Sequence, residues 1–185
     1  YNFDGVLAKR TASSTEKNAV KREYFARSKP DFMKTKFTGA DRGTAIHKFL
    51  EKCDFNSAAD DVSKEKDRLL SLGIMSKKEL DVVSVSDLQS FFNTTVVKRL
   101  LASDEILKEY EFSVLKTAGD MYPEIDPSVA DEEIVVQGKL DCAFIENGKG
   151  VLIDYKSDGI TDENEFISIY KPQIDIYSEA LEKCK

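Results

Sequence analysis

The sequence predicts a mixed α/β fold in which a sheet is flanked by helices and accompanied by a helical insertion. Three observations support this prediction: a strand pattern at 106–115 precedes a hairpin pattern at about 134–156, helical periodicity lies on both sides of these strands, and 58–103 is helical in pattern throughout. With 185 residues and 41% apolar content, the chain fits one domain, 1–185, that buries roughly two thirds of its unfolded surface.

The N-terminal part is predicted to be helical after residues 1–12, which have no clear periodicity. A charged helix is expected at 14–28 and a second helix at about 41–53, whose apolar residues fall on one face. His47 lies on the flank of that face. Gly43, one turn earlier, removes a side chain that would otherwise crowd the imidazole.

The middle of the chain changes from helical to strand periodicity. Within the insertion, the apolar spacing indicates helices up to a turn at Gly73 and one continuous helical stretch over 85–101. The strand at 106–115 is predicted by strict alternation of Tyr110, Phe112 and Val114 with polar residues. A loop is expected through 123–127, and a last helix is expected to begin near Pro172, since proline is accepted at a first helical position.

The hairpin provides the most informative pattern in the chain. Asn147-Gly148 favours a two-residue turn, and counting outward from it places Asp141 opposite Asp154, with Lys139 and Lys156 on the same face. The other face is apolar, pairing Leu140 with Tyr155, Cys142 with Ile153 and Phe144 with Val151. Opposed residues have Cβ atoms roughly 4.5–5.5 Å apart, so two carboxylates there repel unless a cation lies between them. A divalent metal is the natural candidate.

Charge and composition exclude several classes of protein. A formal net charge of −7 argues against a domain that binds nucleic acid unaided, because phosphate contacts from Lys and Arg supply most non-specific affinity. No G-x-x-x-x-G-K-[ST] phosphate loop is present, so an ATP-driven step would lie outside this chain. No membrane span or signal peptide is predicted, which favours a cytoplasmic protein. The three cysteines are far apart, and buried structural thiols are expected.

The acidic pair and the lysine suit phosphodiester hydrolysis. Asp141 and Asp154 supply oxygen ligands for Mg²⁺ or Mn²⁺, and Lys156 supplies a cation for the developing charge. An Asp-x-Lys alone is usually surface charge, but Asp154 follows the apolar run 151–153, where an acid needs a partner. Glu109 could add a carboxylate to the site or be solvated charge.

Four motifs in order resemble the RecB-type nuclease branch of the PD-(D/E)XK superfamily. They are Gly43-Thr44-Ala45-Ile46-His47, Gln137-Gly138-Lys139-Leu140-Asp141, Asp154-Tyr155-Lys156-Ser157-Asp158 and Tyr170-x-x-Gln173-x-x-x-Tyr177. The helical insertion, with Phe91-Phe92 ahead of Lys108-Glu109, resembles more narrowly the C-terminal nuclease domain of AddA-type helicase/nuclease subunits. The resemblance covers about 37–185 and implies a restriction-endonuclease-like fold.

The resemblance also implies roles for particular residues. His47, Asp141, Asp154 and the main-chain carbonyl of Tyr155 would be ligands of Mg²⁺, and Asp141, Asp154 and Lys156 would form the catalytic set. Gln173 and Tyr177 would position DNA, although their spacing on one helical face also fits a brace for the sheet. Glu111 stands where the family often has proline.

The family further implies an upstream helicase and an AddB-type partner subunit, which would deliver single-stranded DNA to an acidic nuclease domain. The expected function is exonuclease processing of double-strand DNA ends for recombinational repair. Two alternatives remain at this point: a catalytically inactive module that binds DNA or a subunit, and a free-standing nuclease of the same superfamily, such as a restriction enzyme.

Overall fold

The computed structural model describes residues 9–11, 39–122, 124–156 and 162–183. The helix predicted at 14–28, the turn predicted at 157–159 and Cys184 lie outside these ranges. The chain divides into two compact units, each assembled from separate segments. The helical unit is defined here as residues 39–108 and 141–156, and the sheet unit as the described parts of 1–24, 109–140 and 159–185.

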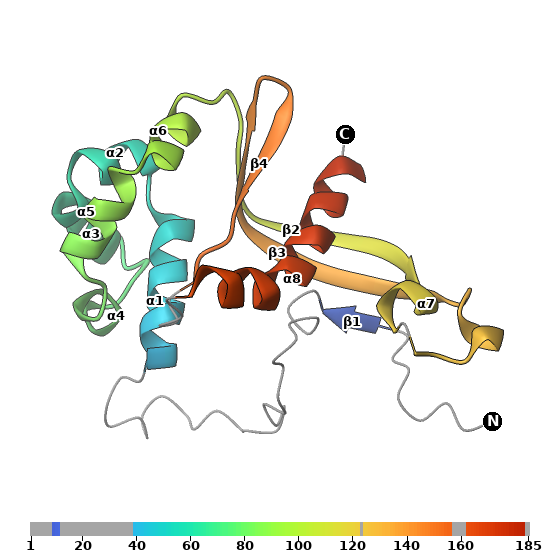
Figure 1. The fold of residues 1–185 in the computed structure, drawn as a ribbon. Coiled ribbons are helices and arrows are strands. Elements are labelled where there is room, and N and C mark those ends of the chain that lie inside the picture. The colour runs from blue at the N-terminus through green and yellow to red at the C-terminus, as the bar shows by residue number, and fades with distance from the viewer. Residues whose placement is uncertain (1–8, 12–38, 123, 157–161, 184–185) are drawn as a thin grey trace. The chain divides into compact units, whose positions relative to one another are not determined.

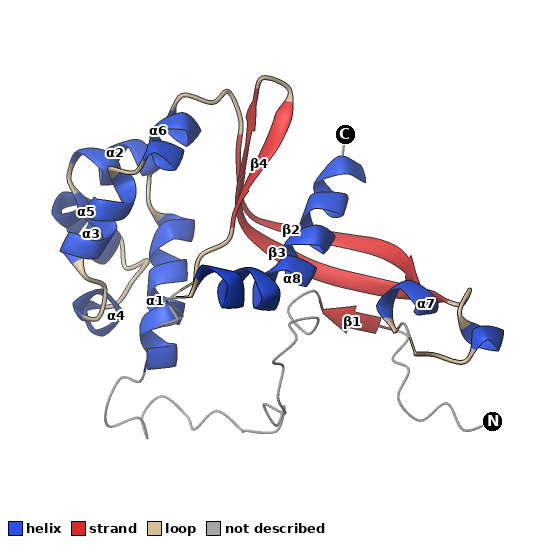
Figure 2. Ribbon diagram, viewed as in Figure 1, coloured by secondary structure: helices blue, strands red, loops and turns tan. Residues whose placement is uncertain are grey.

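Four strands form a mixed sheet: β1 (Lys9–Thr11), β2 (Ile106–Thr117), β3 (Glu133–Glu146) and β4 (Lys149–Ile153). β3 lies between β1 and β2, pairs in parallel with β1 and pairs in antiparallel fashion with β4. Helices accompany the strands in each unit (Figure 1 and Figure 2). The predicted class, mixed α/β with a helical insertion, is therefore confirmed, and it is consistent with a restriction-endonuclease-like fold.

The helical unit begins with α1 (Gly39–Lys52) and continues into the insertion. The insertion is all helical, as predicted, and consists of α2 (Phe55–Asp60), α3 (Val62–Ser71), α4 (Lys77–Asp81), α5 (Val85–Phe92) and α6 (Thr95–Leu101). The predicted turn at Gly73 is present, with a φ of 66° that glycine adopts readily. Each helix of the insertion begins at a side chain that accepts a main-chain N–H, namely Asp54, Asp61, Ser76, Ser84 and Thr94.

One helical prediction in this unit is wrong. The stretch 85–101 is two helices, because Asn93 ends α5 and Thr94 accepts the N–H of Val97 to begin α6. The apolar spacing continues across this break, since Phe92, Val97 and Leu100 are all buried in one core. Periodicity therefore located the buried face, while the cap at Thr94 set the helix boundary.

The β3–β4 hairpin supplies the remaining part of this core. Asn147 and Gly148 form the two-residue turn with φ angles of 52° and 73°, and the register pairs Cys142 with Ile153 and Phe144 with Val151, as predicted. Cys142 and Phe144 are fully buried against α1 and the insertion. The ladder ends at the Cys142–Ile153 pair, so the predicted pairs Asp141–Asp154 and Leu140–Tyr155 fall beyond it, and β4 is three residues shorter than predicted.

In the sheet unit, β2 alternates as predicted, with Phe112 and Val114 buried between exposed polar neighbours. A short helix, α7 (Ala118–Met121), and a 3-10 turn, η3 (Pro127–Val129), occupy part of the predicted loop region.

The last helix, α8 (Glu163–Lys183), begins nine residues before Pro172, so the predicted start is wrong. The main-chain N–H of Glu165 donates to the carboxylate of Asp162 at 2.8 Å, and this cap begins the helix. Proline removes only one main-chain N–H from the interior, and burial of Ile169 and Tyr170 holds the first turns in place. No described helix has the length and apolar character needed to cross a membrane.

Candidate active site

Five of the predicted site residues lie in the helical unit. His47 is on α1, Asp141 is the first residue of this unit on β3, and Asp154, Tyr155 and Lys156 follow directly after β4. The hairpin register and the packing of α1 against the apolar hairpin face bring these separate segments together. Their arrangement can therefore be described within one compact unit.

Three of these residues interact closely. His47 Nδ1 lies 3.2 Å from Asp141 Oδ1, and His47 Nε2 lies 2.9 Å from the main-chain oxygen of Tyr155. The main-chain N–H of Tyr155 donates to Asp141 Oδ2 at 2.7 Å. Asp141 thus contacts both the imidazole and the segment that carries the predicted carbonyl ligand. This side-chain contact takes the place of the main-chain pairing expected for Tyr155.

The group contains more acceptors than a neutral imidazole can satisfy. Two oxygen atoms, one from Asp141 and one from Tyr155, face the two ring nitrogens of His47, and a neutral ring carries only one N–H. A second positive charge, either a proton on the ring or a cation among the oxygens, would balance this set. Carboxylate, carbonyl and imidazole groups are ligands that Mg²⁺ and Mn²⁺ accept, so the donor set fits such an ion.

Asp154 is largely buried, with its side chain 9% exposed. Burial raises the pKa of the Asp154 carboxyl above its ordinary value, and the ammonium of Lys156, 2.8 Å from Oδ2, acts in the opposite direction. The negative charge of Asp141 raises the same pKa further. The prediction that an acid at this position needs a partner is confirmed, and Lys156 is one such partner.

Gln173 and Tyr177 lie in the sheet unit, on α8, and are 3% and 4% exposed. Gln173 Nε2 donates to the hydroxyl of Tyr177 at 2.8 Å, and the Tyr177 ring packs edge to face against Phe112 with centroids 5.5 Å apart. These contacts brace α8 against β2, which was one of the two interpretations of this pair. The DNA-positioning role stays a prediction.

Glu109 also belongs to the sheet unit, where its carboxylate pairs with Lys139 at 2.8 Å. Its φ is 50°, in the left-handed region that residues other than glycine rarely adopt. Alternation in β2 gave no signal of this local irregularity. The auxiliary ligand role of Glu109 stays a prediction.

Sequence reasoning missed a buried cation in the helical unit. Lys108 Nζ donates to the main-chain oxygens of Leu50 and Cys53 at 3.1 and 2.7 Å and lies 3.5 Å from the centre of the Phe55 ring. It satisfies carbonyls at the end of α1, the helix that carries His47. Desolvation lowers the pKa of Lys108. No local pattern predicted this contact, because the donor and acceptors are more than fifty residues apart in sequence.

The two cysteines that the structure describes, Cys53 and Cys142, are buried free thiols, as expected. Burial raises the pKa of Cys53 to about 12 and also raises the pKa of Cys142.

Comparison with known proteins identifies relatives of the chain. No protein-family profile matches it. Curated AddA proteins, each named as a subunit of an ATP-dependent helicase/nuclease, are similar to it: the Clostridium acetobutylicum protein is 32% identical over 163 residues, or 83% of this chain, and the Clostridium botulinum protein is 34% identical over 160 residues, or 84%. The chain is a homologue of these AddA proteins.

The Clostridium novyi AddA protein is 31% identical over 162 residues, again 84% of this chain. The predicted resemblance to AddA-type subunits is confirmed by these matches. The chain spans only 12–13% of the length of these relatives. The matches therefore concern one segment of the AddA proteins.

Proposed function

We propose that this chain is the C-terminal nuclease domain of an AddA-type helicase/nuclease, acting as a Mg²⁺-dependent exonuclease on single-stranded DNA delivered by the helicase. The observation that carries the proposal is the convergence of His47, Asp141 and the Tyr155 carbonyl within one unit, with Asp154 and Lys156 in the same segment as Tyr155. Homology to proteins named as helicase/nuclease subunits supports the same assignment.

The residues that would hold Mg²⁺ or Mn²⁺ are His47, Asp141, Asp154 and the carbonyl of Tyr155. When bound, the ion would polarise a phosphoryl oxygen and acidify a water molecule, which is the chemistry that phosphodiester hydrolysis requires. Asp141 orients this set, because one carboxylate contacts both the His47 ring and the main chain of Tyr155. The surplus of oxygen acceptors around the imidazole is what favours a cation there.

Lys156 would stabilise the negative charge that develops on the phosphate during hydrolysis. Its ammonium is held by Asp154 at 2.8 Å, which fixes a flexible side chain in one place. Because Asp154 is largely buried, the pair is only partly screened by water, and its charges act more strongly than surface charges.

The net charge of −7 fits a domain that receives its substrate from another component. The AddA relatives carry the word helicase in their names, and we propose that an upstream helicase and an AddB-type partner subunit feed a single strand to this domain. The proposed role is the processing of double-strand DNA ends for recombinational repair, in the cytoplasm.

The test compares two lysine variants of the complete helicase/nuclease. Lys156→Ala is expected to lower Mg²⁺-dependent cleavage of single-stranded DNA by about 100-fold or more, since single electrostatic groups of this kind contribute that much. Lys149→Ala, at an exposed position of the same hairpin, is the matched control and should cleave normally. ATP hydrolysis should be unchanged in both variants. Equal cleavage by the two variants would rule out the assignment and favour a module that binds without cutting.

A further inference from the structure

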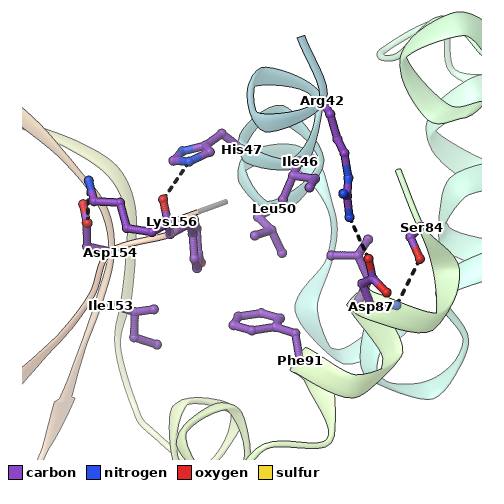
Figure 3. A pocket seen from close by; sticks show the side chains of 12 residues that line it. Arg42, Ile46, His47, Leu50, Ser84, Asp87, Phe91, Ile153, Asp154 and Lys156 are labelled. Carbon is purple, nitrogen blue, oxygen red and sulfur yellow. Dashed lines mark hydrogen bonds and ion pairs between the residues drawn. The ribbon is translucent and has the colours of Figure 1, made fainter. Parts of the chain in front are cut away.

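A cavity of about 380 Å³ lies within the helical unit beside the proposed active site. Figure 3 shows that His47, Asp154 and Lys156 border it on one side, while Arg42 and Asp87 border it on the other. Its interior is largely apolar and is formed by Ile46, Leu50, Leu88, Phe91 and Ile153. An apolar interior with a few polar groups at the rim is typical of a ligand site.

Aromatic rings form a continuous wall of this cavity. The His47 and Tyr155 rings meet edge to face with centroids 5.7 Å apart, and the Tyr155 and Phe91 rings do the same at 5.7 Å. Phe91 in turn packs against Phe92 at 5.3 Å, which fixes its ring. The wall therefore leads from the imidazole of the proposed metal site into the apolar interior.

Ile46, Phe91 and Ile153 are only partly buried, although all three pack against the core of the unit. Leaving apolar side chains partly open to water forgoes hydrophobic stabilisation, so an apolar ligand that covered them would bind favourably. The rim pair of Arg42 and Asp87, at 2.7 Å, has side chains that are 51% and 60% exposed. It borders the opening without covering the interior.

We infer that this cavity receives the nucleobase of a nucleotide next to the phosphate that is cut. The inference rests on the proposed function and extends it from the phosphate to the base. In a nucleic acid, an anionic phosphate and a flat apolar base belong to the same nucleotide. The cavity presents the same order of groups, with the Lys156 ammonium at the rim and the Phe91 and Tyr155 rings inside. Bases stack on aromatic side chains of this kind.

The polar groups around the cavity indicate weak preference among the four bases. Ser84 already accepts the N–H of Asp87 and lies 3.0 Å from the Ser86 hydroxyl, and Asp87 is engaged by Arg42. Recognition through stacking tolerates every base, because each base has a π face. A nuclease that degrades delivered strands of any sequence would need such tolerance.

The test uses single-stranded oligonucleotides in which one residue lacks its base, cut by the complete helicase/nuclease. The missing base should lower cleavage at one neighbouring phosphate by about 5- to 100-fold, the range expected for loss of one stacked base. Cleavage at the other phosphates should be unchanged. The position of the affected phosphate should move with the missing base.

Two variants connect this effect to the cavity. Ile46→Phe fills the interior, and Val85→Phe makes the same change at an exposed apolar position outside the cavity. Only Ile46→Phe should weaken cleavage of normal DNA and abolish the difference between normal and abasic positions. Phe91→Leu keeps apolar volume but removes the ring, and it should reduce the same difference if Ile46→Phe unfolds the unit.

A binding measurement without metal separates this inference from the proposed function. In saturation-transfer NMR with deoxyadenosine 5′-monophosphate, the base protons should receive magnetisation from the wild-type protein and from Val85→Phe, but not from Ile46→Phe. Cleavage that depends on Lys156 but is indifferent to a missing base, together with no transfer to base protons, would overturn the base site and leave the nuclease assignment intact. Cleavage independent of Lys156 would overturn the nuclease assignment, whatever the base protons show.

Discussion

Replacing Asp141 separates the structural work of its carboxylate from its chemical work. One carboxylate oxygen accepts the main-chain N–H of Tyr155 at 2.7 Å, and the other lies 3.2 Å from the His47 ring, in a side chain that is 14% exposed. Asp141→Ala removes both contacts, whereas Asp141→Asn keeps an oxygen that can accept the Tyr155 N–H. The two variants therefore differ in one main-chain hydrogen bond.

The expected loss of unfolding free energy follows from these contacts. A hydrogen bond to a charged group contributes about 1.5–3 kcal/mol, and a part-buried donor without an acceptor costs a similar amount. Asp141→Ala should therefore lose about 2–3 kcal/mol, and Asp141→Asn about 1 kcal/mol or less. Urea unfolding followed by circular dichroism measures both, with Asp104→Ala, at an exposed position of the same unit, as a control expected within about 0.5 kcal/mol of wild type.

Cleavage measured on the same variants completes the test. If the negative charge of Asp141 is required, Asp141→Asn should fold almost as well as wild type yet cleave at least about 100-fold more slowly, as expected for a lost electrostatic contribution. Equal stability of Asp141→Ala and Asp141→Asn would refute the role of the carboxylate in holding Tyr155. Normal cleavage by Asp141→Asn would refute its role as a metal ligand.

Three further predictions concern stability. Because the pKa of Cys53 is raised from 9.0 to about 12, its thiol stays protonated in the folded chain while it ionises in the unfolded chain; stability should fall as pH rises above 9, by about 1.4 kcal/mol at pH 10, and urea midpoints at pH 8 and pH 10 should show a smaller fall in Cys53→Ala. Lys108→Met removes two hydrogen bonds to the end of α1 and should lower the urea midpoint by about 1–3 kcal/mol in unfolding free energy; an unchanged midpoint would mean that water replaces the ammonium. Pro172→Ala restores a main-chain donor inside α8 and should raise the melting temperature, with a gain of about 1 kcal/mol or more; a lower melting temperature would show that the proline ring contributes packing that outweighs its helix penalty.

The sequence alone determined the features that depend on neighbouring residues. Asn147-Gly148 and the alternation around it predicted the turn and the register of β3 and β4, because a two-residue turn and a side-chain period of two leave only one pairing that buries the apolar face. Helical spacing likewise predicted α1 and the insertion. The motifs predicted which five residues of the helical unit would come together.

Tertiary structure decided the features that depend on residues distant in sequence. The hairpin ladder stops at Ile153 because the Tyr155 N–H is bonded to the Asp141 side chain, and α8 extends through Pro172 because its first turns are capped by Asp162 and buried. The burial of Gln173 and the cavity beside Phe91 likewise arise from packing between elements. Local propensities differ by about 1 kcal/mol or less for most residues, whereas burial and buried hydrogen bonds contribute several kcal/mol, so distant contacts prevail wherever the two conflict.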